Sequence, residues 1–170
     1  VSWPTSDYGW INQQIFKILI SLHLNSKEYV ILDSKNFFVA PFTANEIKNS
    51  KPNKLLGYDE KRVNTTKYYC ELFDVPFDDE YMHNITPFVM RTNTAKKLIK
   101  HFNGPKNFSN WFIQHAFDER FSPMEFHVYD VFCKHIGERH TDFQKNNYST
   151  LWGHLKHRDN LTTLQCIRFI

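Results

Sequence analysis

Asp33 and Lys35 are the first residues whose types and position could do chemistry. They follow an apolar run, "YVIL" at 29–32, which predicts a buried strand. In open α/β sheets ligands bind beyond the carboxyl ends of the strands. A carboxylate there can hold a divalent cation that neutralises a diphosphate. Short polar residues in this position also make ordinary turns, so the spacing leaves both a metal site and a turn open.

Lys35 bears on how strong the metal interpretation is. A carboxylate two residues after Asp33 would form Asp-x-Asp, a two-point clamp on a cation, but this chain has a lysine there. The lysine could contact a phosphate directly, pair with Asp33, or lie exposed. The pattern therefore leaves the second contact of any metal site open.

Gln14 and Lys17 lie on the predicted helix that precedes this strand. Apolar residues recur at helical spacing over 10–24, which predicts an amphipathic helix. Gln14 falls on the apolar stripe, where a buried amide must find hydrogen-bond partners. Those partners could belong to a helix–loop contact or to a binding site, and the sequence does not choose between them.

Glu125 stands at the end of "SPME", 122–125, which is typical of a helix start. Ser122 would be the cap, and Glu125 would return to its backbone amide in a capping box. A general base needs the same carboxylate free and facing a cleft. Tyr129 follows one helical turn later on the same face, so the two could line one wall together. Spacing alone favours the capping interpretation.

The histidine-rich tail is the remaining candidate for chemistry. His154 and His157 are three residues apart and Asp159 is near, which could serve a metal-dependent hydrolase if the segment were helical. The segment is not convincingly helical, and nine histidines make such a spacing easy to meet by chance. The chain has no GxGxxG, P-loop, GxSxG or HExxH motif.

Length and composition predict one domain, residues 1–170. The chain is 41% hydrophobic and 16% aromatic, carries 23% charged residues and has a net charge of +3. A chain of this length and hydrophobic content can form one substantial core. A dedicated nucleic-acid binder would cluster basic residues on one face, so no nucleic-acid partner is expected. A mildly basic cleft for phosphorylated ligands stays open.

Cysteine usage and hydropathy predict the compartment. Cys70, Cys133 and Cys166 are widely spaced, without a CxxC motif, which favours a reducing environment and buried thiols over disulfides. The best apolar run, 15–24, is too short and too polar for a membrane span. No secretory signal is recognisable, so a cytoplasmic protein without a membrane span is expected.

The remaining patterns predict the elements that must position these residues. Helix 10–24 followed by strand 29–32 is the order of an α/β fold. Residues 43–65 are polar and predict a loop with at most a short helix. Residues 66–73 fit a helix and a strand equally well. Beyond them the sequence predicts a strand at 86–92 and helices at 94–102, 109–117 and 122–136. A final strand is predicted at 163–170.

Several of these stretches together resemble a known family. "YGWINQQIFKILISLHLNSKEYVILDSKNFFVAPF" is similar to the segment GW-x-x-QQ-x-x-K followed by V-L-D-[SA]-D in uncharacterised bacterial and phage proteins related to GT-A nucleotide-diphospho-sugar glycosyltransferases. "TPFVMRTNTAKKLIKHF", "NWF" and "FSPMEFHVYDVF" resemble that family's following blocks. The match touches most of residues 8–136, and the order of the blocks carries it.

The resemblance implies a GT-A fold, which is an α/β/α sandwich. Asp33 would match the first aspartate of the family's metal motif and place Mn²⁺ or Mg²⁺ on the diphosphate of a nucleotide-sugar donor. Lys35 would match the last motif position and contact phosphate. The implied reaction transfers a sugar to a hydroxyl of a glycan or another acceptor.

The same resemblance implies roles for the helical residues. Gln14 and Lys17 match the helix that helps to hold the donor. Glu125 and Tyr129 match the Ser-Glu…Tyr block near the acceptor, with Glu125 as the catalytic carboxylate.

Two departures from the family pattern lead to an alternative. Lys35 replaces the expected second carboxylate, and the first strand–helix–strand unit, which binds the nucleoside in GT-A folds, has no counterpart here. The domain is therefore expected to be N-terminally incomplete, or to be a non-catalytic binding or structural domain that keeps the fold. An incomplete sheet would expose an edge, and a second copy could pair with it in a homodimer.

Overall fold

The computed structural model describes residues 5–32, 36–38, 53–54, 60–77, 80–81, 88–118, 120–121, 124–138 and 148–150. Asp33 and Lys35 lie outside the described residues. So do the histidine pair at 154 and 157, Cys166 and the strand predicted for 163–170.

The N-terminal helix forms as predicted but ends in a tighter turn. Helix α1 spans Thr5–Leu19 and continues as a 3₁₀ turn, η1, over Ile20–His23. Its isoleucines on one stripe are buried, whereas Leu22 is 41% exposed. The 3₁₀ turn has 3.0 residues per turn instead of 3.6, so Leu22 does not continue the stripe that helical spacing predicts for it.

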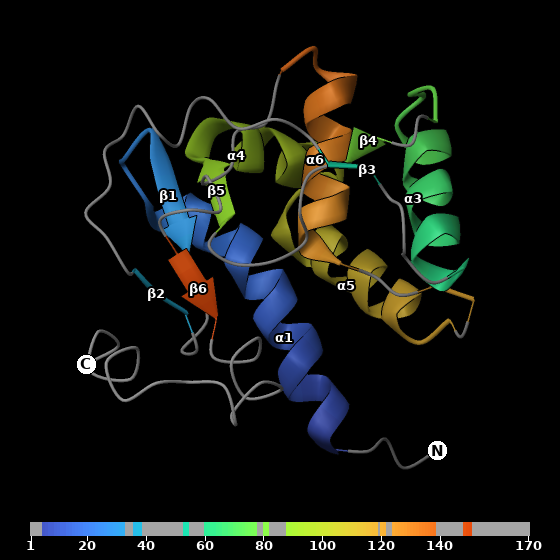
Figure 1. The fold of residues 1–170 in the computed structure, drawn as a ribbon, viewed down its shortest axis with the longest axis horizontal. Helices are drawn as coiled ribbons and strands as arrows, with labels where there is room; N and C mark the ends of the chain where they lie inside the picture. The colour runs from blue at the N-terminus through green and yellow to red at the C-terminus, as the bar shows by residue number, and fades with distance from the viewer. Residues whose placement is uncertain are drawn as a thin grey trace.

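The strands form antiparallel pairs. Strand β1 (Glu28–Ile31) pairs with β5 (Phe88–Arg91), so that Glu28 faces Arg91 and Ile31 faces Phe88. The other pairs are β2 (Asn36–Phe38) with β6 (Tyr148–Thr150), and β3 (Asn53–Lys54) with β4 (Glu80–Tyr81). The described part of the chain is thus mixed α/β and mostly helical, which confirms the fold class at that level (Figure 1).

Helix α3 covers the end of the predicted loop at 43–65, which allowed at most a short helix, and shows that the ambiguous stretch after it is helical. It spans Glu60–Leu72 and buries Tyr69 and Cys70. Polar residues obscured it in the sequence, because its buried face also contains threonines. Thr65 and Thr66 donate their hydroxyl hydrogen bonds back to the carbonyls of Lys61 and Arg62, at 2.7 and 2.9 Å, so these hydroxyls are satisfied inside the helix.

Helices α4 and α5 follow β5 with short connections. Helix α4 is Thr92–His101 and α5 is Pro105–Ala116. The turn between them contains Gly104 at φ 115°, a conformation that glycine adopts without strain. Helix α5 begins at Pro105 rather than after Ser109, because proline fits the first helical position.

The start of helix α6 also differs from the prediction. It spans Glu125–His135, with Met124 at the N-cap and no side-chain cap hydrogen bond. Ser122 lies outside the described residues. The capping-box interpretation of Glu125 is therefore wrong: Glu125 opens the helix instead of standing at its third position, which leaves its carboxylate available for contacts with other elements.

Helix α6 occupies the centre of the core. It packs against α1, α3 and α4, and Figure 1 shows it between α3 and the β1–β5 pair. The hydrophobic cluster joins residues of α1, α3, α4, α5, α6 and both strands of this pair. Cys70 and Cys133 are buried free thiols in that cluster, as predicted. No helix among the described residues is long and apolar enough to cross a membrane.

Candidate functional site

The structure brings Lys17 of α1 and Glu125 of α6 into direct contact. The Lys17 Nζ lies 2.8 Å from the Glu125 Oε1, and the two side chains are 13% and 1% exposed. The two residues are 108 positions apart in the sequence. An ion pair taken this far from water requires further polar contacts to offset its desolvation.

Gln14 supplies one of those contacts. Its side chain is buried, and its amide fits its neighbours with the nitrogen facing the Glu125 carboxylate and the oxygen 3.0 Å from the Trp10 Nε1. The orientation of the amide is assigned from this network. The partners that the sequence requires for a buried Gln14 are therefore Glu125 and Trp10, so three of the six candidate residues form one cluster.

Two contacts hold Lys17 in place, and a third feature stabilises its partner Glu125. The Tyr29 hydroxyl donates a hydrogen bond to the Lys17 carbonyl at 2.9 Å, which ties β1 to α1. The Lys17 ammonium lies 5.0 Å from the centre of the Phe126 ring, within the range of a cation–π contact. Glu125, as the first residue of α6, also benefits from the positive end of the helix dipole.

The cluster of Gln14, Lys17 and Glu125 lies toward the carboxyl end of β1. Ile31, the last residue of β1, faces Phe88. Phe88 stacks on Phe126, the neighbour of Glu125, with ring centres 4.0 Å apart. The chain continues from this end of β1 toward Asp33 and Lys35, which themselves lie outside the described residues.

Burial and pairing bear on the role of Glu125. A general base must reach the proton that it abstracts, whereas this carboxylate is 1% exposed and held by Lys17. In this conformation Glu125 joins α1 to α6. A catalytic role would require its release from Lys17.

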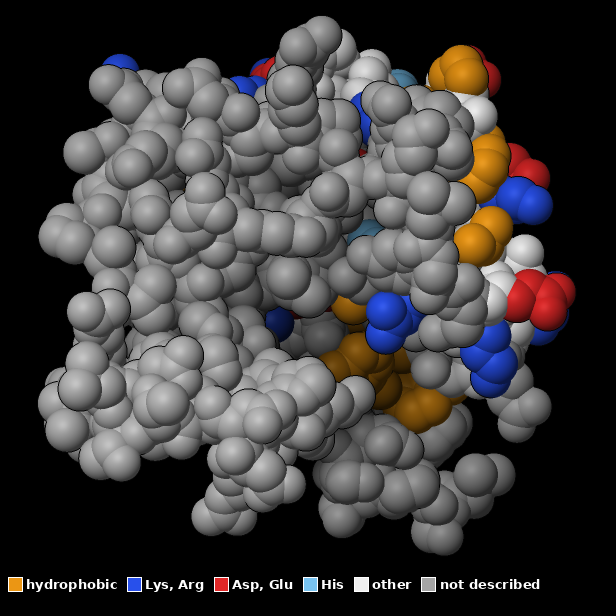
Figure 2. All heavy atoms as spheres, in the orientation of Figure 1, with side chains coloured by type: hydrophobic (Ala, Val, Ile, Leu, Met, Phe, Trp, Pro, Cys, Tyr) orange, Lys and Arg blue, Asp and Glu red, His pale blue; other side chains and the backbone are white. Residues whose placement is uncertain are grey.

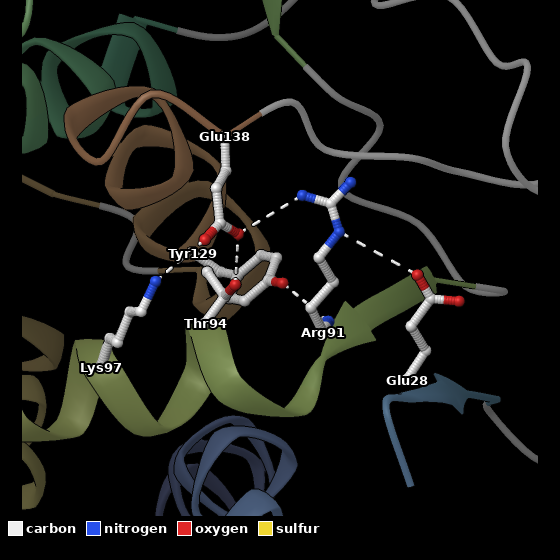
Figure 3. A network of polar contacts seen from close by, with 6 residues as sticks. All are labelled: Glu28, Arg91, Thr94, Lys97, Tyr129 and Glu138. Atoms are coloured by element: carbon white, nitrogen blue, oxygen red, sulfur yellow. Dashed lines mark hydrogen bonds and ion pairs between the residues drawn. The ribbon is translucent and has the colours of Figure 1, made fainter.

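Tyr129 makes its polar contact elsewhere. It is buried, and its hydroxyl accepts a hydrogen bond from the Arg91 backbone N–H at 2.7 Å (Figure 3). Burial raises the pKa of this hydroxyl. Arg91 is the residue that faces Glu28 in the strand pair. The predicted common wall with Glu125 is therefore not formed by these polar groups: Tyr129 points toward the opposite end of β1–β5.

That opposite end contains a polar network that the sequence analysis missed. Glu138 accepts hydrogen bonds from Arg91 Nη1 at 3.3 Å, from Lys97 Nζ at 3.1 Å and from the Thr94 hydroxyl. Figure 3 shows these donors arriving from β5 and α4 around one carboxylate. Partial burial raises the pKa of Glu138, but the hydrogen bonds from Thr94, Lys97 and Arg91 outweigh it and bring the pKa below its ordinary value.

A sequence signal for this network existed. "NTAKKLIK", 93–100, places polar residues at one helical face and apolar residues at the other. Glu138 has no such signal, because it follows the end of α6 and is brought to α4 only by the packing of the two helices. Among the described residues, no group of three or more His, Cys, Asp or Glu is arranged to hold a metal. Asp33 stays the predicted metal ligand.

A family model matches residues 5–160 of the chain, described as a family of unknown function (DUF6492). The chain belongs to DUF6492. No curated protein and no solved structure matches it. The DUF6492 match spans all six candidate residues and both polar clusters, and its description assigns no activity to them.

Proposed function

We propose that this DUF6492 chain is a glycosyltransferase-like domain of GT-A type, which transfers a sugar from a nucleotide-sugar donor to an acceptor hydroxyl with the help of Mn²⁺ or Mg²⁺. The family resemblance of the sequence blocks supports the proposal. The observation that carries it is the Lys17–Glu125 pair with Gln14: residues from two distant blocks meet beside the strand that leads into Asp33.

The proposal gives each residue a distinct task. Asp33 would hold the cation, and the cation would neutralise the charge that develops on the leaving diphosphate. Lys35 would contact a phosphate oxygen directly as a point charge. Gln14 and Lys17 would fix α1 against α6 and so hold the donor side of the site in place.

The GT-A sandwich belongs to the same proposal. In it, β1 is the strand that presents the metal motif, and α1 and α6 are helices that cover it. The antiparallel β1–β5 pair would be one part of a larger sheet. Glu125 acts as a positioning residue in the paired state and as the base only after release from Lys17.

The test is the melting temperature of the chain with a panel of nucleoside diphosphates and sugar nucleotides, with and without MnCl₂. We expect one nucleotide to raise the melting temperature only when Mn²⁺ is present, and Asp33→Asn to remove most of that rise. Asp74→Asn is the matched control: Asp74 is exposed and has φ 52°, a conformation that asparagine tolerates. A manganese-dependent rise that survives Asp33→Asn would overturn the assignment of the metal to Asp33.

A second candidate is a non-catalytic binding or structural domain of the same fold. The observation that favours it is the burial of Glu125 in an ion pair, because a site without catalytic activity needs no free base. It predicts no turnover of any sugar nucleotide. Donor hydrolysis by the purified chain, abolished by Asp33→Asn and retained by Asp74→Asn, would exclude it.

A further inference from the structure

A basic cleft lies beside the Glu138 network, away from the Lys17–Glu125 pair. Its volume is about 720 Å³, and its basic lining residues are Lys27, Arg91, Lys96, Lys97 and Lys100. A cleft of this size suits a small-molecule ligand. The contacts around it indicate what kind of ligand that is.

Helix α4 forms one wall of the cleft with a single face. Asn93, Lys96, Lys97 and Lys100 all line the cleft, and their spacing of three, one and three residues places them on one side of a helix. The opposite face, with Leu98 and Ile99, is buried in the core. The first turn of α4, whose N–H groups carry partial positive charge, belongs to the same wall.

Lys27 and Arg91 line the cleft from the end of the strand pair. The Thr92 backbone N–H donates to the Lys27 carbonyl at 2.9 Å, which fixes the residue before β1 against the start of α4. Arg91 is held by the Glu138 carboxylate at 3.3 Å and lies 4.0 Å from that of Glu28. Contacts among the start of β1, the end of β5 and helix α4 therefore build the cleft, which is not a row of lysines on one helix.

The positive charges in the cleft exceed the negative ones. Among the residues that the structure describes, five basic side chains line it against two carboxylates, Glu28 and Glu138, which is a surplus of three positive charges. Both carboxylates already face Arg91 or Lys97. Lys96 donates to the Leu24 carbonyl at 3.1 Å, which is a neutral acceptor and not a carboxylate.

Another exposed helix face of the same chain lacks this charge imbalance. Helix α3 exposes Glu60, Lys61, Lys67 and Glu71, two of each sign. Figure 2 shows both signs interspersed with hydrophobic side chains along the edge that α3 occupies in Figure 1. Mixed charge is what a merely solvated surface requires, whereas a concave surface of one sign concentrates anions.

We propose that this cleft binds a soluble phosphate-bearing ligand with at least two negative charges, such as a diphosphate or a phosphate ester. Lysine ammonium groups serve as point contacts to phosphate oxygens, and Arg91, whose Nη1 is held by Glu138, adds a positive charge fixed beside them. The site is independent of the proposed donor site, because it lies at the amino end of β1. A strand of four residues, at about 3.3 Å each, separates the two ends.

The experiment is calorimetric titration of the full chain with sodium pyrophosphate in EDTA, without any divalent metal. We expect saturable binding that Lys27→Gln/Lys100→Gln weakens by about tenfold or more, because two of the charges are lost. Lys106→Gln, an exposed lysine on α5 outside the cleft, removes one charge and should leave the affinity close to that of wild type.

Three outcomes would overturn the proposal. They are the absence of saturable binding, an equal weakening by Lys106→Gln, and sulfate binding as tightly as pyrophosphate at matched ionic strength. In the first of these cases, binding to phosphatidic acid vesicles would show that the cleft takes a lipid headgroup and not a soluble ligand. Asp33→Asn separates this test from that of the proposed function, since it should leave metal-free pyrophosphate binding intact.

Discussion

Glu125 and Glu138 lie at the two ends of helix α6, and each contacts a lysine. Comparing them shows how burial changes the energy of a carboxylate–lysine pair. Glu125 is the first residue of the helix, is 1% exposed and contacts Lys17 at 2.8 Å. Glu138 follows the end of the helix, is 25% exposed and contacts Lys97 at 3.1 Å. Water screens the second pair and not the first, so similar distances correspond to different energies.

The helix dipole acts in opposite directions on the two glutamates. The positive end of α6 stabilises a carboxylate at Glu125, whereas the negative end disfavours one near Glu138. Glu138 compensates with hydrogen bonds from Arg91, Thr94 and Lys97. The two ends of one helix therefore stabilise a carboxylate by different means.

The largest effect is expected for Lys17→Met. It leaves the Glu125 charge buried without its cation, which costs about 3–5 kcal/mol of the free energy of unfolding. Urea denaturation measures this loss. The double variant Lys17→Met/Glu125→Gln should recover part of it, since no buried charge then remains. A loss below about 1 kcal/mol would mean that this pair behaves like a surface pair.

An intermediate effect is expected from pH, through His127 in the same buried helix. Burial, and secondly the positive charge of Arg62, lower the pKa of His127 to about 4. The unfolded chain binds this proton at about pH 6.5, so acid favours unfolding. The stability lost between pH 7 and pH 5 should be about 2 kcal/mol, measured as the change in the free energy of unfolding in urea.

Two variants distinguish the buried region from the exposed one in this titration. His127→Gln should reduce the loss between pH 7 and pH 5. Glu138→Gln should leave it unchanged, because the lowered pKa of Glu138 makes its contribution disappear only below its ordinary value of 4.5. Equal pH profiles for wild type and His127→Gln would show that other groups cause the acid response.

The smallest effect is expected for Lys97→Gln. Lys97 is 57% exposed, and Glu138 keeps Arg91 and Thr94 as partners. The free energy of unfolding should fall by no more than about 1 kcal/mol. A loss as large as that of Lys17→Met would contradict the distinction between the two ends of α6.

Whether an element was predicted depended on the signal that its own sequence carries. Helices α1 and α4 and strands β1 and β5 were predicted because their apolar residues repeat with a clear period. Helix α3 was only partly predicted, with 66–73 left open between helix and strand, because Thr65 and Thr66 lie on its buried face and interrupt the apolar pattern. The start of α6 was misplaced because "SPME" has the pattern of a capping box without forming one.

The sequence by itself determined which side chains require partners. Gln14 on an apolar stripe had to be hydrogen-bonded, and Glu125 had to be either a cap or a contact within a site. Only the tertiary structure decided that these requirements are met together, through Lys17 and across 108 residues of sequence. The physical reason is that local periodicity fixes the buried face of a helix, whereas the packing of α1 on α6 fixes what that face meets.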